Sequence, residues 1–408
     1  MHKCDRQRLE DKVKTFSTFG DTGKGGVTRA TLSPEAQAAR AEFKRRMEAA
    51  GATVVTDDVA NMYATLEGSD PAAKRIAMAS HADSVKCGGN YDGILGVLGG
   101  MEVIESISAG KIPHRHPITA MIWTNEEGAF YPPAMMCSGI VCGKYKKEDM
   151  LTSKNPDGQT FGEALQKSGY IGEAANRFSA EKYAAMFELH IEQGPRLEAA
   201  GVDVGVVENV IGITAYRIRA YGQSDHAGTT PMSGRRDALF ACAKLLVMLH
   251  EELDKVDPEL VYTNGFIKVH PCMHTIIPDF CEFILDMRHV DPAVLKKCVA
   301  IVERIPKEVA GCKVEFEVAW ARPTVPFDRK LVGIVKASVD ALGYSNMYMN
   351  SGAGHDAQFV AEVVPTTMIF VPSKDGHSHC ELEYTAPRLC AQGVDVLLNA
   401  VLELDKTL

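Results

Sequence analysis

Four short apolar runs, separated by helix-like stretches, constrain the fold of this chain more than any other feature. The runs have the length and composition of buried strands and lie at residues 76–79, 118–123, 186–191 and 367–371. Helix-like patterns occupy residues 33–50, 94–109 and 181–185. Alternating strands and helices predict an α/β fold whose sheet is mixed or mostly parallel. Ligand sites in such sheets gather at the carboxyl ends of the strands, so functional residues are expected there.

The middle of the chain follows a different pattern, with polar and apolar residues alternating as in half-exposed antiparallel strands. These strands are predicted at residues 213–221, 266–269, 280–288 and 314–318, with helices at 235–253 and 292–310. The resulting β-α-β-β-α-β order is typical of a ferredoxin-like α+β domain. We therefore predict an inserted domain over residues 212–322, which interrupts a larger domain made of residues 1–211 and 323–408.

Composition excludes several classes of partner. A chain of 408 residues is long enough for two or three domains. Its net charge of −9 argues against nucleic acid, which binds basic surfaces. No apolar stretch approaches the ~18 to 20 residues that span a bilayer. We expect neither a nucleic-acid nor a membrane partner.

Cysteine usage and the N-terminus indicate the compartment. The 11 cysteines are scattered and include no Cys-x-x-Cys pair. This pattern argues against a disulfide framework and fits a reducing environment. The first residues contain no apolar signal core. A cytoplasmic location is therefore expected.

Two adjacent carboxylates, Glu126 and Glu127, end the second apolar run. Neighbouring carboxylates repel each other unless a cation or a proton separates their roles. One economical arrangement lets Glu127 bind a metal ion while Glu126 handles a proton. Most Glu pairs are simply solvated, but this pair ends an apolar strand instead of lying on a charged helix.

Acidic residues also follow the first apolar run. His81 and Asp83 are two apart, so an extended backbone puts both on one face, where the carboxylate could orient the imidazole. A pair in a surface loop is the alternative. Asp92 is flanked by Gly93 and a preceding glycine turn, which would let its carboxylate approach a cation. As an alternative, Asp92 is a turn residue or the N-cap of the helix that follows.

The remaining imidazoles complete a candidate metal site. His190 lies within the third run, where a structural histidine is the alternative, and His377 and His379 flank Ser378 after the fourth. Together, these imidazoles and carboxylates suffice for two ions that share a bridging group. Such mixtures suit Zn²⁺, with Mn²⁺, Co²⁺ or Ni²⁺ as alternatives. The set predicts a metal-dependent hydrolase.

At this point the chain closely resembles a known group of enzymes, and the matching motifs occur in the same order. They lie at residues 25–29, 80–85, 91–93, 124–128, 188–195, 225–232, 351–357 and 378–379. The chain is similar to the N-carbamoyl-L-amino-acid amidohydrolase, allantoate amidohydrolase and β-ureidopropionase group. That group lies within the aminoacylase-type di-metal amidohydrolases. The resemblance runs from about residue 20 to the C-terminus and implies a di-metal aminopeptidase-like catalytic domain.

The resemblance also implies the metal ligands. His81 and His190 would hold one divalent ion, Glu127 and His379 would hold the other, and Asp92 would bridge the two.

Catalytic roles follow in the same way. Glu126 would be the general base and Asp83 the partner of the His81 imidazole. The inserted domain would serve as a lid and dimerisation domain, so a homodimer is expected. His226 would come from this lid, in relatives often from the other subunit, and polarise the scissile carbonyl. Without the resemblance, His226 would be read as an ordinary loop histidine.

Substrate contacts are implied for Gln193, Arg288 and Gly354, with Arg288 holding a substrate carboxylate. Several positions depart from the group's pattern, among them Cys272, Met273 and His274, which replace a usually polar or small stretch. Thr275 stands where relatives usually carry an Asn that helps bind the carboxylate, and Phe130 stands where they usually carry an Arg. The substrate pocket is therefore expected to differ from that of relatives, while the metal site is intact.

The leading hypothesis is a hydrolase that cleaves the C–N bond of a ureido compound carrying a carboxylate. N-carbamoyl amino acids, N-carbamoyl-β-alanine and allantoate are examples, and simple carbamoyl substrates would release ammonia and CO₂. An N-acyl-amino-acid deacylase or dipeptidase with the same metals is one alternative. A non-catalytic binding protein on the same fold is another.

Overall fold

The computed structural model describes residues 1–408 and divides the chain into two compact units. Unit 1 consists of Met1–Glu208 and Pro326–Leu408, and unit 2 consists of Asn209–Val325. Unit 2 thus extends three residues beyond the predicted insert at each end. None of the helices combines the length and the apolar character that crossing a bilayer requires.

Unit 1 is built on a nine-stranded mixed sheet, which confirms the predicted α/β class. The strand order is β1-β2-β4-β3-β5-β14-β6-β12, and β13 pairs with β6. Its four central strands, β4, β3, β5 and β14, run parallel to one another, whereas β1, β2 and β6 pair antiparallel with their neighbours. The strands are β1 (Thr53–Thr56), β2 (Met62–Leu66), β3 (Arg75–His81), β4 (Ile118–Trp123), β5 (Tyr183–Ile191), β6 (Val204–Val210), β12 (Val325–Pro326), β13 (Asn346–Ser351) and β14 (Thr366–Val371).

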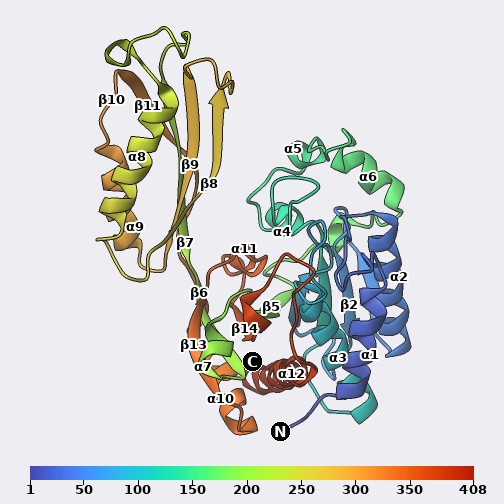
Figure 1. Cartoon of the computed structure of the whole chain (residues 1–408). Helices are drawn as coiled ribbons and strands as arrows, with labels where there is room; N and C mark the ends of the chain where they lie inside the picture. The colour runs from blue at the N-terminus through green and yellow to red at the C-terminus, as the bar shows by residue number, and fades with distance from the viewer. The chain divides into compact units, whose positions relative to one another are not determined.

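Long helices cover this sheet (Figure 1). Helix α3 packs on β3, β4 and β5, and α12 packs on β5 and β14. Every residue of β4 is buried, as the continuous apolar run predicts for a central strand. The helices of unit 1 are α1 (Arg6–Ser17), α2 (Pro34–Ala49), α3 (Ile94–Gly110), α4 (Met136–Val141), α5 (Lys147–Leu151), α6 (Phe161–Ser168), α7 (Arg196–Ala200), α10 (Arg329–Leu342), α11 (Ala357–Val360) and α12 (Pro387–Thr407).

One predicted element of unit 1 is wrong. Residues 181–185 were expected to be helical, but β5 begins at Tyr183. Tyr183 pairs with Arg75 of β3, and its buried ring stacks on Phe178 with the ring centroids 4.2 Å apart. Sheet pairing and burial therefore outweigh the local helical preference of a five-residue segment, because short segments take their structure from tertiary contacts.

The parallel register determines where the site forms. His81, the last residue of β3, is level with Trp123 at the end of β4. On the other side of the sheet centre, His190 of β5 is level with Phe370 of β14. The loops that leave these four strands therefore emerge at one edge of the sheet, where α/β proteins bind their ligands.

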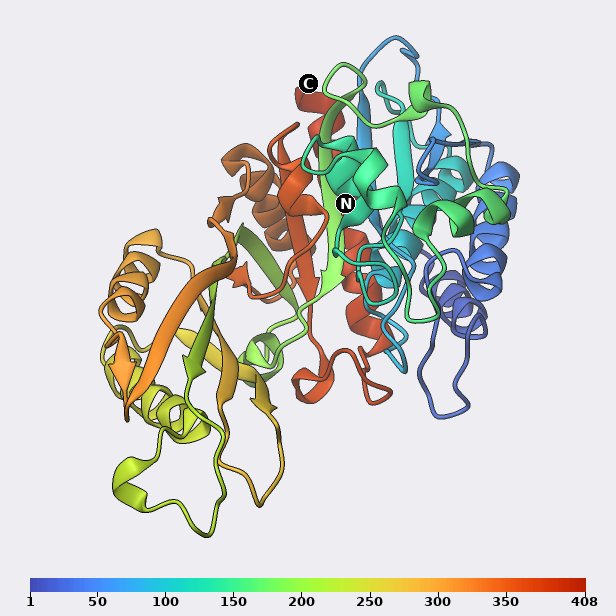
Figure 2. The ribbon, with the colours of Figure 1, turned by 90° about the horizontal axis from the view of Figure 1, so that it is seen from above.

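Unit 2 is a five-stranded antiparallel sheet with the order β10-β11-β7-β9-β8. Its two helices pack on one face of the sheet, as Figure 2 shows, and enclose a core that includes Leu245, Phe283 and Cys298. The elements are β7 (Gly212–Tyr221), α8 (Ala238–Leu253), β8 (Val261–His270), β9 (Phe280–His289), α9 (Pro292–Glu303), β10 (Glu308–Val309) and β11 (Cys312–Arg322).

The predicted β-α-β-β-α-β order of unit 2 is present, with changed bounds for both helices and one additional strand, β10. The first helix begins at Ala238, because the Asp237 side chain accepts the Phe240 N–H and caps it there. The second helix was predicted to reach residue 310 but ends at Glu303. Pro306 follows, and proline lacks the N–H that would continue a helix. Strand β10 then occupies part of the predicted helix.

Candidate metal centre and active site

The first cluster at the carboxyl edge of the unit 1 sheet brings together His81, His190 and Asp92. Asp92 Oδ1 lies 3.5 Å from His81 Nε2 and 3.2 Å from His190 Nε2. All three side chains are buried. His81 ends β3, His190 is near the end of β5, and Asp92 lies in the loop before α3. Three residues from separate strands and loops thus converge on one point.

A second cluster shares the same aspartate. His379 Nε2 lies 3.2 Å from Asp92 Oδ2 and 3.3 Å from Glu127 Oε2. Each oxygen of the Asp92 carboxylate therefore faces a different cluster. The structure brings together all five residues that were expected to hold two ions, in the expected partition.

Both clusters fit a divalent cation by chemistry and by spacing. Ligands at 2.0–2.2 Å from a tetrahedral ion lie about 3.4 Å from each other. The distances from the imidazole nitrogens to the Asp92 oxygens, 3.2 to 3.5 Å, agree with this value. Nitrogen from imidazole and oxygen from carboxylate are the donors that Zn²⁺ and related metals take.

Hydrogen bonds orient the two buried imidazoles. His81 Nδ1 lies 3.0 Å from the Asp83 carbonyl oxygen, and His190 Nδ1 lies 2.9 Å from the Ile191 carbonyl oxygen. A carbonyl can only accept, so each Nδ1 carries the proton and each Nε2 presents its lone pair to the cluster. His190 Nε2 also accepts the Gly93 N–H at 3.1 Å.

Gly93 is required sterically beside these rings. Its φ of +64° is in the region that side chains rarely adopt. A β-carbon at this position would lie 2.2 Å from His81 Nε2. Gly93, and not the Asp92 side chain, occupies the N-cap position of α3, and no side chain caps that helix. Asp92 lies in the turn before α3, as one alternative predicted, but its predicted role as a helix cap is wrong.

The Asp83 carboxylate contacts the glutamate pair more closely than it contacts His81. It accepts the backbone N–H groups of Glu126 and Glu127, both at 3.2 Å, whereas His81 Nδ1 is 3.9 Å away. The Thr31 hydroxyl donates to the same carboxylate at 3.2 Å. Asp83 thus ties the loop after β4 to the loop after β3, and it orients His81 through its main-chain carbonyl.

Electrostatics in the first cluster favour a bound cation. Burial alone would lower the pKa of His81, but Glu126, Asp92 and Asp83 together raise it well above its ordinary value. Burial would raise the pKa of Asp92, but hydrogen bonds from His190, His379 and His81 hold it well below its ordinary value. Both shifts favour positive charge beside the buried Asp92 carboxylate, and a bound divalent cation would supply it.

The pKa values of Glu126 and Glu127 are shifted upward, in the direction opposite to that of Asp92. Burial, reinforced by Asp356, Glu127 and Asp83, raises the pKa of Glu126 well above its ordinary value. Burial and Asp92 raise the pKa of Glu127 to about 7. A buried carboxyl group whose pKa lies nearer neutrality is suited to exchange protons with a substrate.

Gln193 and Gly354, the predicted substrate contacts of unit 1, lie beside the two clusters. Gln193 Nε2 donates to Asp92 Oδ2 at 2.7 Å, and its Oε1 is buried and accepts no hydrogen bond from the protein. Gly354 belongs to the turn between β13 and α11. That turn is anchored beside the centre by His355, whose ring centroid is 4.6 Å from that of His190.

In unit 2, His226 and Thr275 belong to two exposed loop segments that pair with each other. The Ala227 N–H donates to the Thr275 carbonyl at 2.9 Å, and His226 forms a β-bridge with Ile276. His226 Nδ1 accepts the Gly228 N–H at 2.9 Å. This bond leaves Nε2 of the neutral ring as the protonated nitrogen.

Arg288 lies on β9, and its guanidinium contacts a neighbouring acid. Its Nε donates to Asp286 Oδ1 at 2.7 Å, and Nη2 lies 3.3 Å from Asp286 Oδ2. Asp286 and Arg288 are two apart on one strand and so face the same side of the sheet. Phe130, the other departure from the expected pattern, is in unit 1 and packs against an apolar cluster that includes Tyr131 and Met136.

Sequence reasoning missed two residues that support the centre. Arg29 is buried and donates to the Ala82 carbonyl at 3.1 Å, between His81 and Asp83. Glu383 is buried beside Asp92. Arg29 lay within a recognised motif but had no assigned role. Glu383 and Glu381 are both acids close to His379, and nothing in their spacing distinguishes the one that turns inward.

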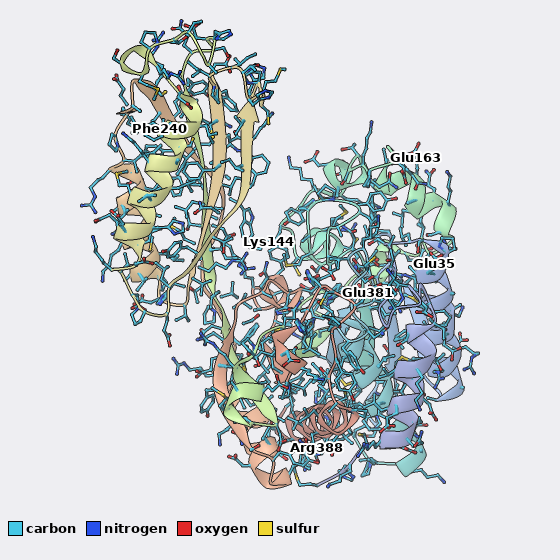
Figure 3. All side chains as sticks on the ribbon, viewed as in Figure 1. Glu35, Lys144, Glu163, Phe240, Glu381 and Arg388 are labelled. Carbon is cyan, nitrogen blue, oxygen red and sulfur yellow. The ribbon has the colours of Figure 1, made fainter.

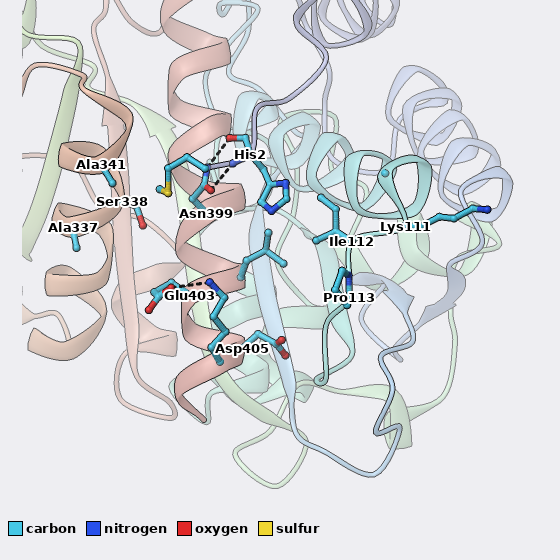
Figure 4. Close-up of a pocket in the computed structure, with 14 residues that line it drawn as sticks. His2, Lys111, Ile112, Pro113, Ala337, Ser338, Ala341, Asn399, Glu403 and Asp405 are labelled. Carbon is cyan, nitrogen blue, oxygen red and sulfur yellow. Dashed lines mark hydrogen bonds and ion pairs between the residues drawn. The ribbon is translucent and has the colours of Figure 1, made fainter.

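A separate pocket contains none of the predicted site residues. It lies between the N-terminus, the turn after α3, α10 and α12, with a volume of about 530 Å³ (Figure 4). Its wall includes Asp405, whose carboxylate accepts the backbone N–H groups of Arg115 and His116 at 2.7 to 3.0 Å.

A family model agrees with the chain over most of its length. The description of that model is peptidase family M20/M25/M40, and the match covers residues 77–403. The chain belongs to this family. The N-carbamoyl-L-amino-acid amidohydrolase of Rhizobium meliloti is 37% identical over 406 residues, which are 98% of this chain and 97% of the relative. The allantoate amidohydrolase of Escherichia coli (strain K12) is 32% identical over 395 residues, 96% of each protein.

Solved structures also resemble this chain over nearly its whole length. A hydantoinase/carbamoylase family amidase from Burkholderia multivorans superposes with a TM-score of 0.89 at 40% identity, covering 98% of both chains. This M20/M25/M40 member is therefore an enzyme that hydrolyses amide-type C–N bonds. The comparisons do not favour the deacylase, dipeptidase and non-catalytic alternatives.

Proposed function

We propose that this enzyme hydrolyses the C–N bond of a ureido group in a small molecule that carries a carboxylate, using two divalent ions. The observation that carries the proposal is the Asp92 carboxylate, whose two oxygens face two separate imidazole-containing clusters. The names of the relatives, which act on N-carbamoyl amino acids and allantoate, support the ureido class. For a simple carbamoyl substrate, RNH–CO–NH₂ and water would yield RNH₂, CO₂ and NH₃.

His81 and His190 would hold one ion, Glu127 and His379 the other, with Asp92 between them. When bound, such a pair polarises a carbonyl oxygen and lowers the pKa of water. The mixed nitrogen and oxygen donors suit Zn²⁺ first, with Mn²⁺, Co²⁺ or Ni²⁺ as alternatives.

Glu126 is proposed to move the proton. It is buried, it belongs to neither cluster, and its Oε2 lies 3.6 Å from His81 Nε2. Its raised pKa allows it to take a proton from the attacking water and to deliver that proton to the departing nitrogen. Asp83 would assist by fixing the backbone that carries Glu126.

The remaining residues would recognise the substrate. The buried Gln193 Oε1 is an acceptor of the kind that a ureido N–H requires. In unit 2, the proposed lid, His226 Nε2–H would polarise the scissile carbonyl. Arg288 would bind the substrate carboxylate, assisted by the Thr275 hydroxyl. Gly354 would contribute a backbone contact.

The experiment that tests this function is a substrate panel on enzyme reconstituted with each metal. Ammonia release would be measured from N-carbamoyl amino acids, N-carbamoyl-β-alanine and allantoate, and amino acid release from N-acyl amino acids and dipeptides. Turnover of at least one ureido compound with ammonia release is expected. Activity confined to acyl or dipeptide substrates would reject the ureido assignment. Because Thr275 and Phe130 depart from the family pattern, the preferred ureido compound should differ from that of relatives.

We further propose a cytoplasmic homodimer. All 11 cysteines are unpaired, which suits a reducing compartment. Unit 2 exposes Phe240 on α8 (Figure 3) and Phe266 and Ile267 on β8, the edge strand of its sheet. An apolar edge strand beside an apolar helix face is suited to self-association. Light scattering should find a dimer in the wild type and a monomer in Phe240→Asp/Ile267→Asp, and a monomeric wild type would contradict the proposal.

A further inference from the structure

A buried carboxylate links the two loops that carry Asp92 and His379. Glu383 lies four residues after His379, in the segment between β14 and α12. Its Oε1 accepts the backbone N–H of Tyr91 at 2.8 Å and that of Asp92 at 3.0 Å. Its Oε2 lies 3.1 Å from the Ser378 hydroxyl. One side chain therefore contacts the main chain on one side of the centre and the loop on the other.

The surroundings of Glu383 leave little freedom. Its side chain is only 3% exposed. A β-carbon at Gly89 would lie 2.0 Å from the Glu383 carboxyl carbon, so only glycine allows the loop before Asp92 to approach this closely. The carboxylate is thus enclosed by the backbone that it binds.

Glu383 also reaches the Asp92 carboxylate indirectly. The Ser378 hydroxyl that contacts Glu383 lies 3.0 Å from Asp92 Oδ2. The same oxygen accepts from Gln193 Nε2, and Oδ1 lies 3.2 Å from His190 Nε2. The main chain of Asp92 is held by Glu383, and its side chain is held by Ser378. Together these contacts determine which way each Asp92 oxygen points.

We propose that Glu383 is a positioning residue that holds Asp92 in the orientation shared by the two metal clusters. The inference rests on the proposed di-metal function. It requires the length and the accepting oxygen of the Glu383 side chain and not its charge. Residues that hold a metal ligand through hydrogen bonds typically alter metal affinity by about 10- to 100-fold when they are changed.

The test compares two variants that separate reach from charge. Glu383→Gln keeps the length and an oxygen that accepts both N–H groups, so Zn²⁺ affinity should stay within about threefold of wild type. Glu383→Asp keeps the charge but is one methylene shorter, so Zn²⁺ affinity should fall by about 10- to 100-fold. Zn²⁺ binding to the metal-free proteins would be measured by competition with a chelating dye.

Asp405 provides a matched control. It is also a buried carboxylate that accepts two backbone N–H groups, but it lies in the pocket wall of Figure 4, outside the metal clusters. Asp405→Ala should lower the melting temperature and leave Zn²⁺ affinity unchanged. A merely structural role for Glu383 would give its variants this same behaviour.

The outcomes are distinguishable. If the wild-type protein binds no Zn²⁺, the proposed metal centre itself is wrong. If the wild type binds two ions and Glu383→Asp binds them equally tightly, only the positioning role is lost. A Glu383→Gln variant as weak as Glu383→Asp would also overturn it, because charge and not geometry would then be the requirement. Metal affinity gives the answer without any assumption about the substrate.

Discussion

The two units of this enzyme present their candidate functional residues in opposite ways. In unit 1, His81, Asp92 and His190 are buried and each is held by hydrogen bonds, and His379 is the one exposed residue among the five expected ligands. In unit 2, His226 and Thr275 lie on exposed loop segments that are fixed mainly by each other. One unit contains a prepared metal centre, and the other exposes groups for a ligand.

The contrast indicates a division of labour. Burying imidazoles and carboxylates together is costly unless they are paired or bind a cation, so unit 1 is organised around its proposed ions. Exposed loop residues tolerate substitution more readily than buried ones. Thr275 and Phe130, the two positions at which the chain departs from the expected pattern, lie outside the metal clusters. This enzyme is therefore expected to share its reaction chemistry with its relatives and to differ from them in its preferred substrate.

The largest effect should come from Glu126→Gln. Removing a general base typically lowers kcat by about 10² to 10⁴. Metal content should remain near two ions per chain, because Glu126 belongs to neither cluster. Steady-state kinetics and elemental analysis of the same preparation would check both statements. Glu127→Gln is the control and should lose metal. A Glu126→Gln enzyme with most of its activity would show that the proton is handled elsewhere.

His226→Ala tests the exposed unit with the next largest effect. Loss of one donor to the developing oxyanion commonly reduces kcat by about 10² to 10³. Metal affinity should not change if unit 2 acts only on the substrate. Weaker Zn²⁺ binding in this variant would contradict the proposal that unit 1 alone holds the metal ions and unit 2 acts only on the substrate.

Arg288→Ala should act on binding in both the ground state and the transition state. Loss of a bidentate carboxylate clamp should cost ~2 to 4 kcal/mol in kcat/KM. A substrate analogue without the carboxylate should react equally with both enzymes, and measuring the two substrates in parallel isolates the interaction. Equal losses with both substrates would place Arg288 in a structural role, through its pair with Asp286.

The last prediction concerns pH and belongs to unit 1 alone. The Asp92 hydrogen bond and the Glu127 charge raise the pKa of His379 to about 9, and burial and Asp92 raise the pKa of Glu127 to about 7. Both groups must lose a proton to bind a cation, so Zn²⁺ affinity should rise between pH 6 and 9, by roughly tenfold per pH unit for each proton released. Calorimetry in two buffers of different ionisation enthalpy would count the protons. Binding without proton release would contradict these shifts.

Much of unit 1 was predictable, because burial and chemistry coincide in its sequence. The apolar runs that are followed by His81 and by Glu126 and Glu127 predict both a central strand and a functional site at its carboxyl end. The short segment at residues 181–185 was misread, since its structure depends on pairing with β3, which local pattern does not show. The partition of the five ligands came from resemblance and not from spacing.

Supporting contacts were harder to foresee. Whether the Asp83 carboxylate turns toward His81 or toward the backbone of Glu126 depends on how two loops pack. The same is true of Glu383, whose neighbour Glu381 makes none of its contacts with Tyr91 and Asp92. Such choices are made by long-range geometry, and a single sequence contains no local signal for them.

The metal centre should be highly sensitive to substitution at Gly93. The space above its α-carbon is occupied by the His81 ring, so a single methyl group there would push the imidazole out of line. The substitution Gly93→Ala would change none of the proposed catalytic or metal-binding residues, yet it should abolish activity. Nature could thus inactivate this protein by one small change that an inventory of its active-site residues would overlook.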